Sequence, residues 1–111
     1  MTDIIHANAD RIRELFGQSE QHTMRIQIES EIANCQIKYD SVLCAGIVKP
    51  LFRTLDMAEI VCKYADEFIK LAATTESSID NLKIALAMME PRNAIANETR
   101  LLADRLRHKN E

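Results

Sequence analysis

The chain has 111 residues, of which 47% are apolar and 28% charged, enough for one small hydrophobic core beneath a charged surface. Its formal net charge of −3 gives no support for binding to nucleic acid or to an acidic membrane surface. Its apolar stretches are all shorter than the roughly 18 residues that cross a bilayer, so we expect no membrane span.

Composition also limits the fold class. Two glycines and two prolines are too few for the tight turns that connect β-hairpins. The abundant Ala, Leu, Glu and Arg are good helix formers. We therefore predict an all-α fold, an antiparallel helical bundle of four to five helices, three of them long. It forms a single domain over residues 1–111, with residues 107–111 frayed at the C-terminus.

The three cysteines, Cys35, Cys44 and Cys62, are odd in number and follow no secretory signal peptide, because the first residues contain neither a basic segment nor a long apolar core. A disulfide framework is not expected in such a chain. We therefore expect a cytoplasmic protein with free thiols.

The first two predicted helices follow from apolar residues spaced three and four apart. The first covers residues 3–16 and is ended by Gly17, which can adopt the left-handed conformation of a C-cap. Its stripe is Ile5, Ala9, Ile12 and Phe16. The second begins at Ser19 as N-cap and extends to about residue 45.

The second predicted helix is apolar on two sides. One stripe is Ile28, Ile32, Cys35, Tyr39 and Val42, and the other is Ile26, Ala33 and Ile37. Such a helix is usually buried between neighbours, and we expect that here. Residues 24–29 also alternate with period two, as in a strand, but no turn residues follow that would allow a partner strand.

The third predicted helix opens at Pro50 or Thr54, because Gly46 and Pro50 interrupt the preceding pattern, and it extends to about Ala73. Its stripe is Met57, Ile60, Val61, Tyr64, Phe68 and Leu71. The opposite face carries two i,i+4 pairs with the acid first, Glu59 with Lys63 and Asp66 with Lys70.

A polar connector precedes the last helical segment, whose N-cap we place at Ser77 or Ser78. Its first stripe is Ile79, Leu82, Leu86 and Met89. Pro91 then either starts a fifth helix or kinks one long helix. Beyond this proline the stripe is Ile95, Thr99, Leu102 and Leu106.

Residues suited to catalysis or metal binding lack the spacing that such sites need. Cys35 and Cys44 are nine residues apart and face opposite sides of a helix, and no CxxC, CxxH or HxxxH motif occurs. Two glycines cannot supply a phosphate-binding loop. We expect no metal, no cofactor and no enzymatic activity. The remaining enzymatic hypothesis is a thiolate nucleophile, for which Cys62 is the candidate.

Basic residues near the C-terminus support an alternative. Arg100 and Arg107 are seven residues apart and share a helix face, and with Arg105 they form a candidate phosphate-contacting surface. Glu98 and Asp104 dilute this positive charge, and cations near a helix C-terminus also stabilise its dipole. A nucleic-acid-binding regulator is therefore the alternative function, and nucleic acid is not the partner we favour.

Apolar residues exceed what one small core needs, both on the second predicted helix and near the start of the last segment. We take four of them as candidate partner-binding residues: Ile26, Ile37, Ile84 and Met88. Methionine surfaces can repack around different partners. We predict a non-enzymatic protein–protein interaction module, an adaptor, chaperone-like partner or regulator of a larger complex. It docks through a helix face onto another protein or itself, and we expect a homodimer.

Overall fold

The computed structural model describes residues 2–41, 48–74 and 76–109. These residues form four helices and no strand: α1 (Thr2–Gly17), α2 (His22–Ser41), α3 (Val48–Ala72) and α4 (Ile79–Lys109). The all-α prediction is confirmed, and the number of helices is four. α4 includes the first three of the residues 107–111 that we expected to fray, and residues 110–111 lie outside the described part.

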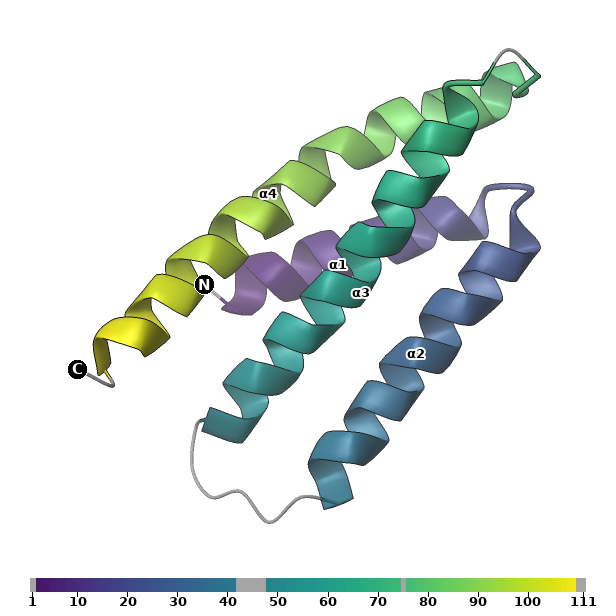
Figure 1. Cartoon of the computed structure of the whole chain (residues 1–111). Coiled ribbons are helices and arrows are strands. Elements are labelled where there is room, and N and C mark those ends of the chain that lie inside the picture. Colours follow the sequence, from purple (N-terminus) through teal and green to yellow (C-terminus); the bar gives the residue numbers. More distant parts are fainter. Residues whose placement is uncertain (1, 42–47, 75, 110–111) are drawn as a thin grey trace.

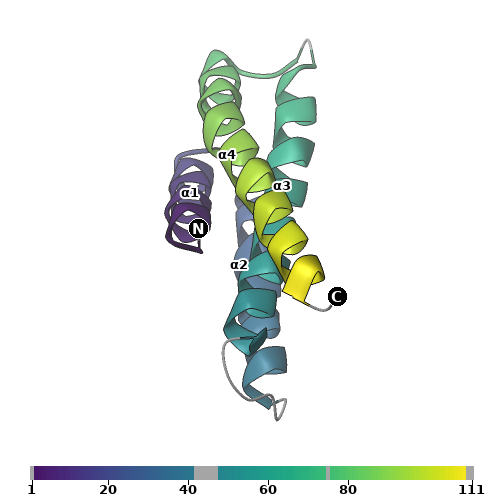
Figure 2. The ribbon, with the colours of Figure 1, turned by 90° about the vertical axis from the view of Figure 1, so that its left-hand side faces the viewer.

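Three helices lie side by side in the order α4, α3 and α2, and α1 crosses behind them (Figure 1). The view from the side shows α1 on one side of α3, with the first half of α4 above it on the same side before α4 crosses α3 (Figure 2). α1 packs against all three other helices, whereas the described parts of α2 and α4 do not touch each other. The molecule is elongated, with extents of 49 × 26 × 18 Å.

The core forms where α1 meets α3 and α4. The predicted stripe of α1 is buried in full, and Phe16 meets Phe68 of α3 edge-to-face with ring centroids 5.3 Å apart, a favourable aromatic geometry. α4 contributes Met88 and Ile95, both fully buried. The prediction that the first helix is amphipathic with one core face is therefore confirmed.

The turn between α1 and α2 differs from its prediction. Gly17 completes the last turn of α1 without adopting the left-handed conformation. The chain is instead held by Ser19, which is buried; its hydroxyl donates to the Phe16 carbonyl at 2.9 Å and accepts from the Gln21 amide at 3.2 Å. Because Ser19 is used in this turn, α2 starts three residues later than we predicted, at His22.

α2 is buried on one side only, so the expectation of burial on two sides is wrong. Ile28, Ile32 and Cys35 are buried against the core, whereas Ile26 and Ile37 are 67% and 65% exposed. The reason is its position at the edge of the layer, where only α1 and α3 pack against it. The predicted extension of this helix to residue 45, and Val42 in its stripe, lie outside the described residues.

Both prolines lie within helices. Pro50 is in the first turn of α3, where a backbone N–H has no intrahelical acceptor and its loss costs nothing. Ser78 is the N-cap of α4, its hydroxyl accepting from the Asn81 amide at 3.1 Å. Pro91 neither ends α4 nor starts a fifth helix, and α4 is continuous from Ile79 to Lys109.

The ion pairs of α3 connect helices instead of stabilising α3 alone. Lys63 pairs with Glu31 of α2 at 3.8 Å. Asp66 accepts two hydrogen bonds from Arg92 of α4, at 2.8 and 3.1 Å. This bidentate bond is the largest cause of the raised pKa of Arg92. The two i,i+4 pairs predicted within α3 are thus replaced by contacts that fix α2 and α4 on either side of it.

Candidate interaction surface

The first half of α4 presents a row of large apolar side chains to solvent. Ile79, Leu82, Leu86 and Met89 are 72%, 39%, 68% and 44% exposed. Their spacings of three, four and three residues place them on one helix face over about 15 Å. We call these four residues the α4 apolar face. Scattered exposed apolar residues are ordinary, whereas a row of them on one helix face is a candidate interaction site.

The core side of α4 is a different row. Asn81, Met88, Ile95 and Leu102 are buried and follow one another at intervals of seven residues. This row continues through Pro91 along the whole helix, whereas the α4 apolar face is followed on the same side by Asn93 and Arg100, both exposed. In the sequence, the core row can be distinguished from the exposed row because only the core row stays apolar beyond Pro91.

The four predicted partner-binding residues do not form one surface. Ile26 and Ile37 are exposed on α2, and α2 does not contact α4 in the described residues. Ile84 is half-buried against the core. Met88 is fully buried, so it is a core residue and does not reach a partner in this conformation. Sequence reasoning identified the apolar surplus of α4 but assigned its members to the wrong sides.

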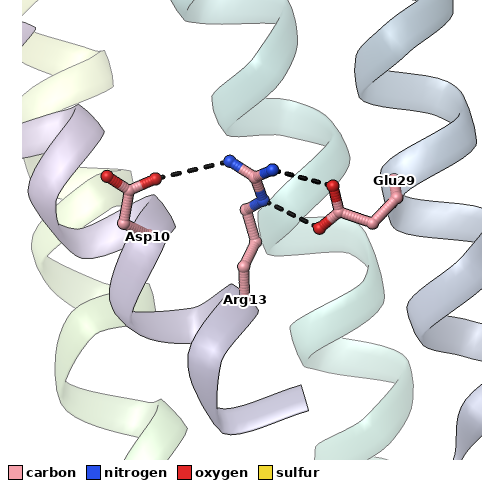
Figure 3. A network of polar contacts seen from close by, with 3 residues as sticks. All are labelled: Asp10, Arg13 and Glu29. Carbon is pink, nitrogen blue, oxygen red and sulfur yellow. Dashed lines mark hydrogen bonds and ion pairs between the residues drawn. The ribbon is translucent and has the colours of Figure 1, made fainter. Parts of the chain in front are cut away.

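A polar network joins α1 to α2 (Figure 3). Arg13 donates to both carboxylate oxygens of Glu29, at 2.9 and 2.7 Å, and to Asp10 at 3.3 Å. The bidentate hydrogen bond is the largest cause of the lowered pKa of Glu29 and of the raised pKa of Arg13. These side chains pair with one another, so the network positions α2 and leaves no group poised for chemistry.

A groove of about 410 Å³ lies between α2 and α3. Two lysines and three carboxylates face it, and its lining is Glu31, Asn34, Cys35, Lys38, Asp56, Glu59, Ile60 and Lys63. At one side Tyr64 is buried, and the neighbouring Glu31 carboxylate together with burial raises the pKa of Tyr64 to about 12. Two of the three carboxylates are paired, Asp56 with Lys38 at 3.5 Å and Glu31 with Lys63 at 3.8 Å, whereas Glu59 forms no ion pair among the described residues.

The cysteines of the described residues are in environments that favour the neutral thiol. Burial is the largest cause of the raised pKa of both Cys35 and Cys62. Each sulfur lies 3.9 Å from a backbone carbonyl, that of Arg53 and that of Arg92 respectively. No group of three or more potential metal ligands occurs among the described residues, and Cys44 lies outside them.

The basic residues of the alternative hypothesis are exposed on the second half of α4. Arg100 donates to Asn97 at 2.9 Å, and Arg107 lies 3.9 Å from Asp104. Arg105 is also exposed. Exposed pairs of this kind are weak, so these residues stay accessible, but Asp104 lies beside them and lowers the local positive potential.

The chain matches no known protein family, no characterised protein and no solved structure in the comparisons made with it. None of the helices in the described residues combines the length and the apolarity that crossing a membrane requires.

Proposed function

We propose that this protein is a non-enzymatic protein–protein interaction module that docks through the α4 apolar face. The observation that carries the proposal is the exposure of Ile79, Leu82, Leu86 and Met89 in one row, while the core of the chain is complete without them. The module acts as an adaptor or regulator, because docking a helix face onto another helix changes assembly without any chemical step.

Burial of the α4 apolar face against a partner contributes a large free energy for so small a surface. The exposed fractions of the four side chains amount to roughly two fully exposed side chains, and burying one stabilises by about 1.5–3 kcal/mol. Contact with a partner therefore offers about 3–6 kcal/mol from this chain alone, before contributions from the partner. This exceeds what the weak exposed ion pairs of α4 can provide.

Site-specific photo-cross-linking in the producing cell tests the proposal. A photo-reactive residue replaces Leu86 on the α4 apolar face, and in a matched variant it replaces Leu101, which is on the same helix but outside the row and only 38% exposed. We expect a discrete cross-linked protein, either a second copy or another chain, from position 86 and not from position 101. Equal cross-linking from the two positions, or none from either, would remove the proposal.

A further inference from the structure

We propose that the occupant of the α4 apolar face is a second copy of this chain, packed antiparallel across a two-fold axis. This inference rests on the proposed function and names its partner. The spacing of three, four and three residues is that of alternating a and d positions in a coiled coil, a narrow seam that fits another helix. The helix that matches such a seam in length and side-chain size is α4 itself.

The apolar face is complementary to itself when one helix is reversed. In an antiparallel pair centred between Leu82 and Leu86, each of these leucines lies opposite the other in the second copy. Ile79 then lies opposite Met89 at both ends. Four layers of apolar contact form, and each unbranched methionine can adapt to the isoleucine that it meets. A contact in which the same patch serves both subunits is the commonest kind of homodimer interface.

The charges that flank the face select the antiparallel orientation. Lys83 and Glu90 are exposed, lie seven residues apart on the side away from α3, and form no ion pair in the described part of the chain. Reversing one helix brings this flank against the same flank of the other copy. Lys83 of each copy then faces Glu90 of the other across two apolar layers, so two equivalent ion pairs form.

A parallel pair would not use these charges. The flank facing Lys83 and Glu90 would then be the one next to α3, formed by Ser78, Ala85 and Arg92. Of these, Ala85 is buried and Arg92 is already bound to Asp66 by two hydrogen bonds. The charge pattern therefore matches one orientation only.

The chain exposes more surface than a compact monomer of its mass. A compact monomer of this mass, 12.6 kDa, exposes about 6,200 Å², whereas this chain exposes 7144 Å². Its radius of gyration is 15.2 Å against about 13 Å for a compact domain of this length. The excess of about 900 Å² reflects the elongated shape of the whole molecule and is not confined to the α4 apolar face.

Light scattering on a size-exclusion column, over roughly 1 μM to 1 mM chain, measures the proposed dimer. We expect the wild-type mass to rise from one chain to two across this range. Leu86→Glu should stay monomeric, and Leu101→Glu should dimerise like the wild type, because it adds the same charge to α4 outside the face. Circular dichroism confirms that each variant is folded, and Met89→Glu serves if Leu86→Glu is not.

Charge exchange then tests the orientation. Lys83→Glu and Glu90→Lys should each weaken dimerisation roughly 5- to 30-fold, since each turns two attractive pairs into repulsive ones. The double variant should restore the wild-type dissociation constant. A double variant as weak as the single ones would overturn the antiparallel arrangement.

The failures of the inference and of the proposed function are distinguishable. A wild-type chain that is monomeric at about 1 mM overturns the inference. If position 86 still cross-links to a different protein in the cell, the proposed function stands with a foreign partner. A dimer that survives Leu86→Glu but is lost with Ile37→Glu places the contact on α2 and also overturns the inference.

Discussion

Alanine substitution of Met88 and of Leu86, in separate variants, compares how much the buried and the exposed sides of α4 contribute to stability. The two residues are two positions apart on one helix; Met88 is fully buried and Leu86 is 68% exposed. Replacing a fully buried methionine with alanine removes its contacts and leaves a cavity, which costs about 2–5 kcal/mol of unfolding free energy. We expect Met88→Ala to fall within this range, because Met88 is fully buried in the core.

Leu86→Ala should cost much less. Full burial of a leucine is worth about 2–3 kcal/mol, and only about a third of this side chain is buried within the chain, so at most about 1 kcal/mol is lost. The higher helix propensity of alanine returns a few tenths of this amount. We therefore expect Met88→Ala to be more destabilising than Leu86→Ala by at least about 1–2 kcal/mol.

Urea denaturation followed by circular dichroism measures both variants, and the dependence of free energy on denaturant should stay unchanged. The comparison is made at low protein concentration, so that self-association does not contribute to the stability of the wild type. Repeating it at high concentration should enlarge the effect of Leu86→Ala alone. If both variants lose the same free energy at low concentration, the assignment of the two sides of α4 is wrong.

Three further predictions concern ionisable groups. Because the pKa of Glu29 is lowered by its pairing with Arg13, this pairing stabilises the fold fully above pH 4.5, the ordinary pKa of a glutamate. The stabilisation is lost as the pH falls through the lowered pKa of the folded state. Glu29→Gln should therefore flatten the acid side of a plot of unfolding free energy against pH. The raised pKa of Tyr64 stabilises the fold in the opposite pH range. This stabilisation is complete below pH 10 and is lost as the pH rises towards 12. In an alkaline titration, Tyr64→Phe should therefore remove the tyrosinate absorbance that appears at the highest pH. Because burial raises the pKa of Cys62, native alkylation followed by peptide mass mapping should label this thiol far more slowly than in denaturant, and rapid native labelling would instead revive the thiolate hypothesis.

Helix identity could be predicted from the sequence because apolar periodicity and scarce turn residues point the same way along the chain. The cap at Ser78 and the core stripe of α1 also follow from local rules. The start of α2 could not be predicted, because the competing use of Ser19 is a hydrogen bond to Phe16 that depends on the folded turn.

The buried side of α4 could not be recognised from its amino-acid composition. The buried row, with one residue every seven, begins with the polar Asn81, whose side-chain oxygen is buried without a hydrogen-bond partner. Apolar periodicity therefore identifies the α4 apolar face first and not the buried row. The exposed row, from Ile79 to Met89, has the stronger apolar pattern over its length. Amphipathicity alone therefore assigns the outer side of this helix to the core.

The number of helices in a domain determines whether the second apolar side of a helix is buried or exposed. A helix with two apolar sides is buried when neighbours cover both, and this requires a layer on each side of it. Among the described residues, α2 packs only against α1 and α3, and so does α4, so the outer side of each of these two helices has no neighbour. In a chain of 111 residues with four helices, a second apolar side on an edge helix is surface. On our proposal its contacts come from another molecule, and α4 has the longer continuous row from which to make them.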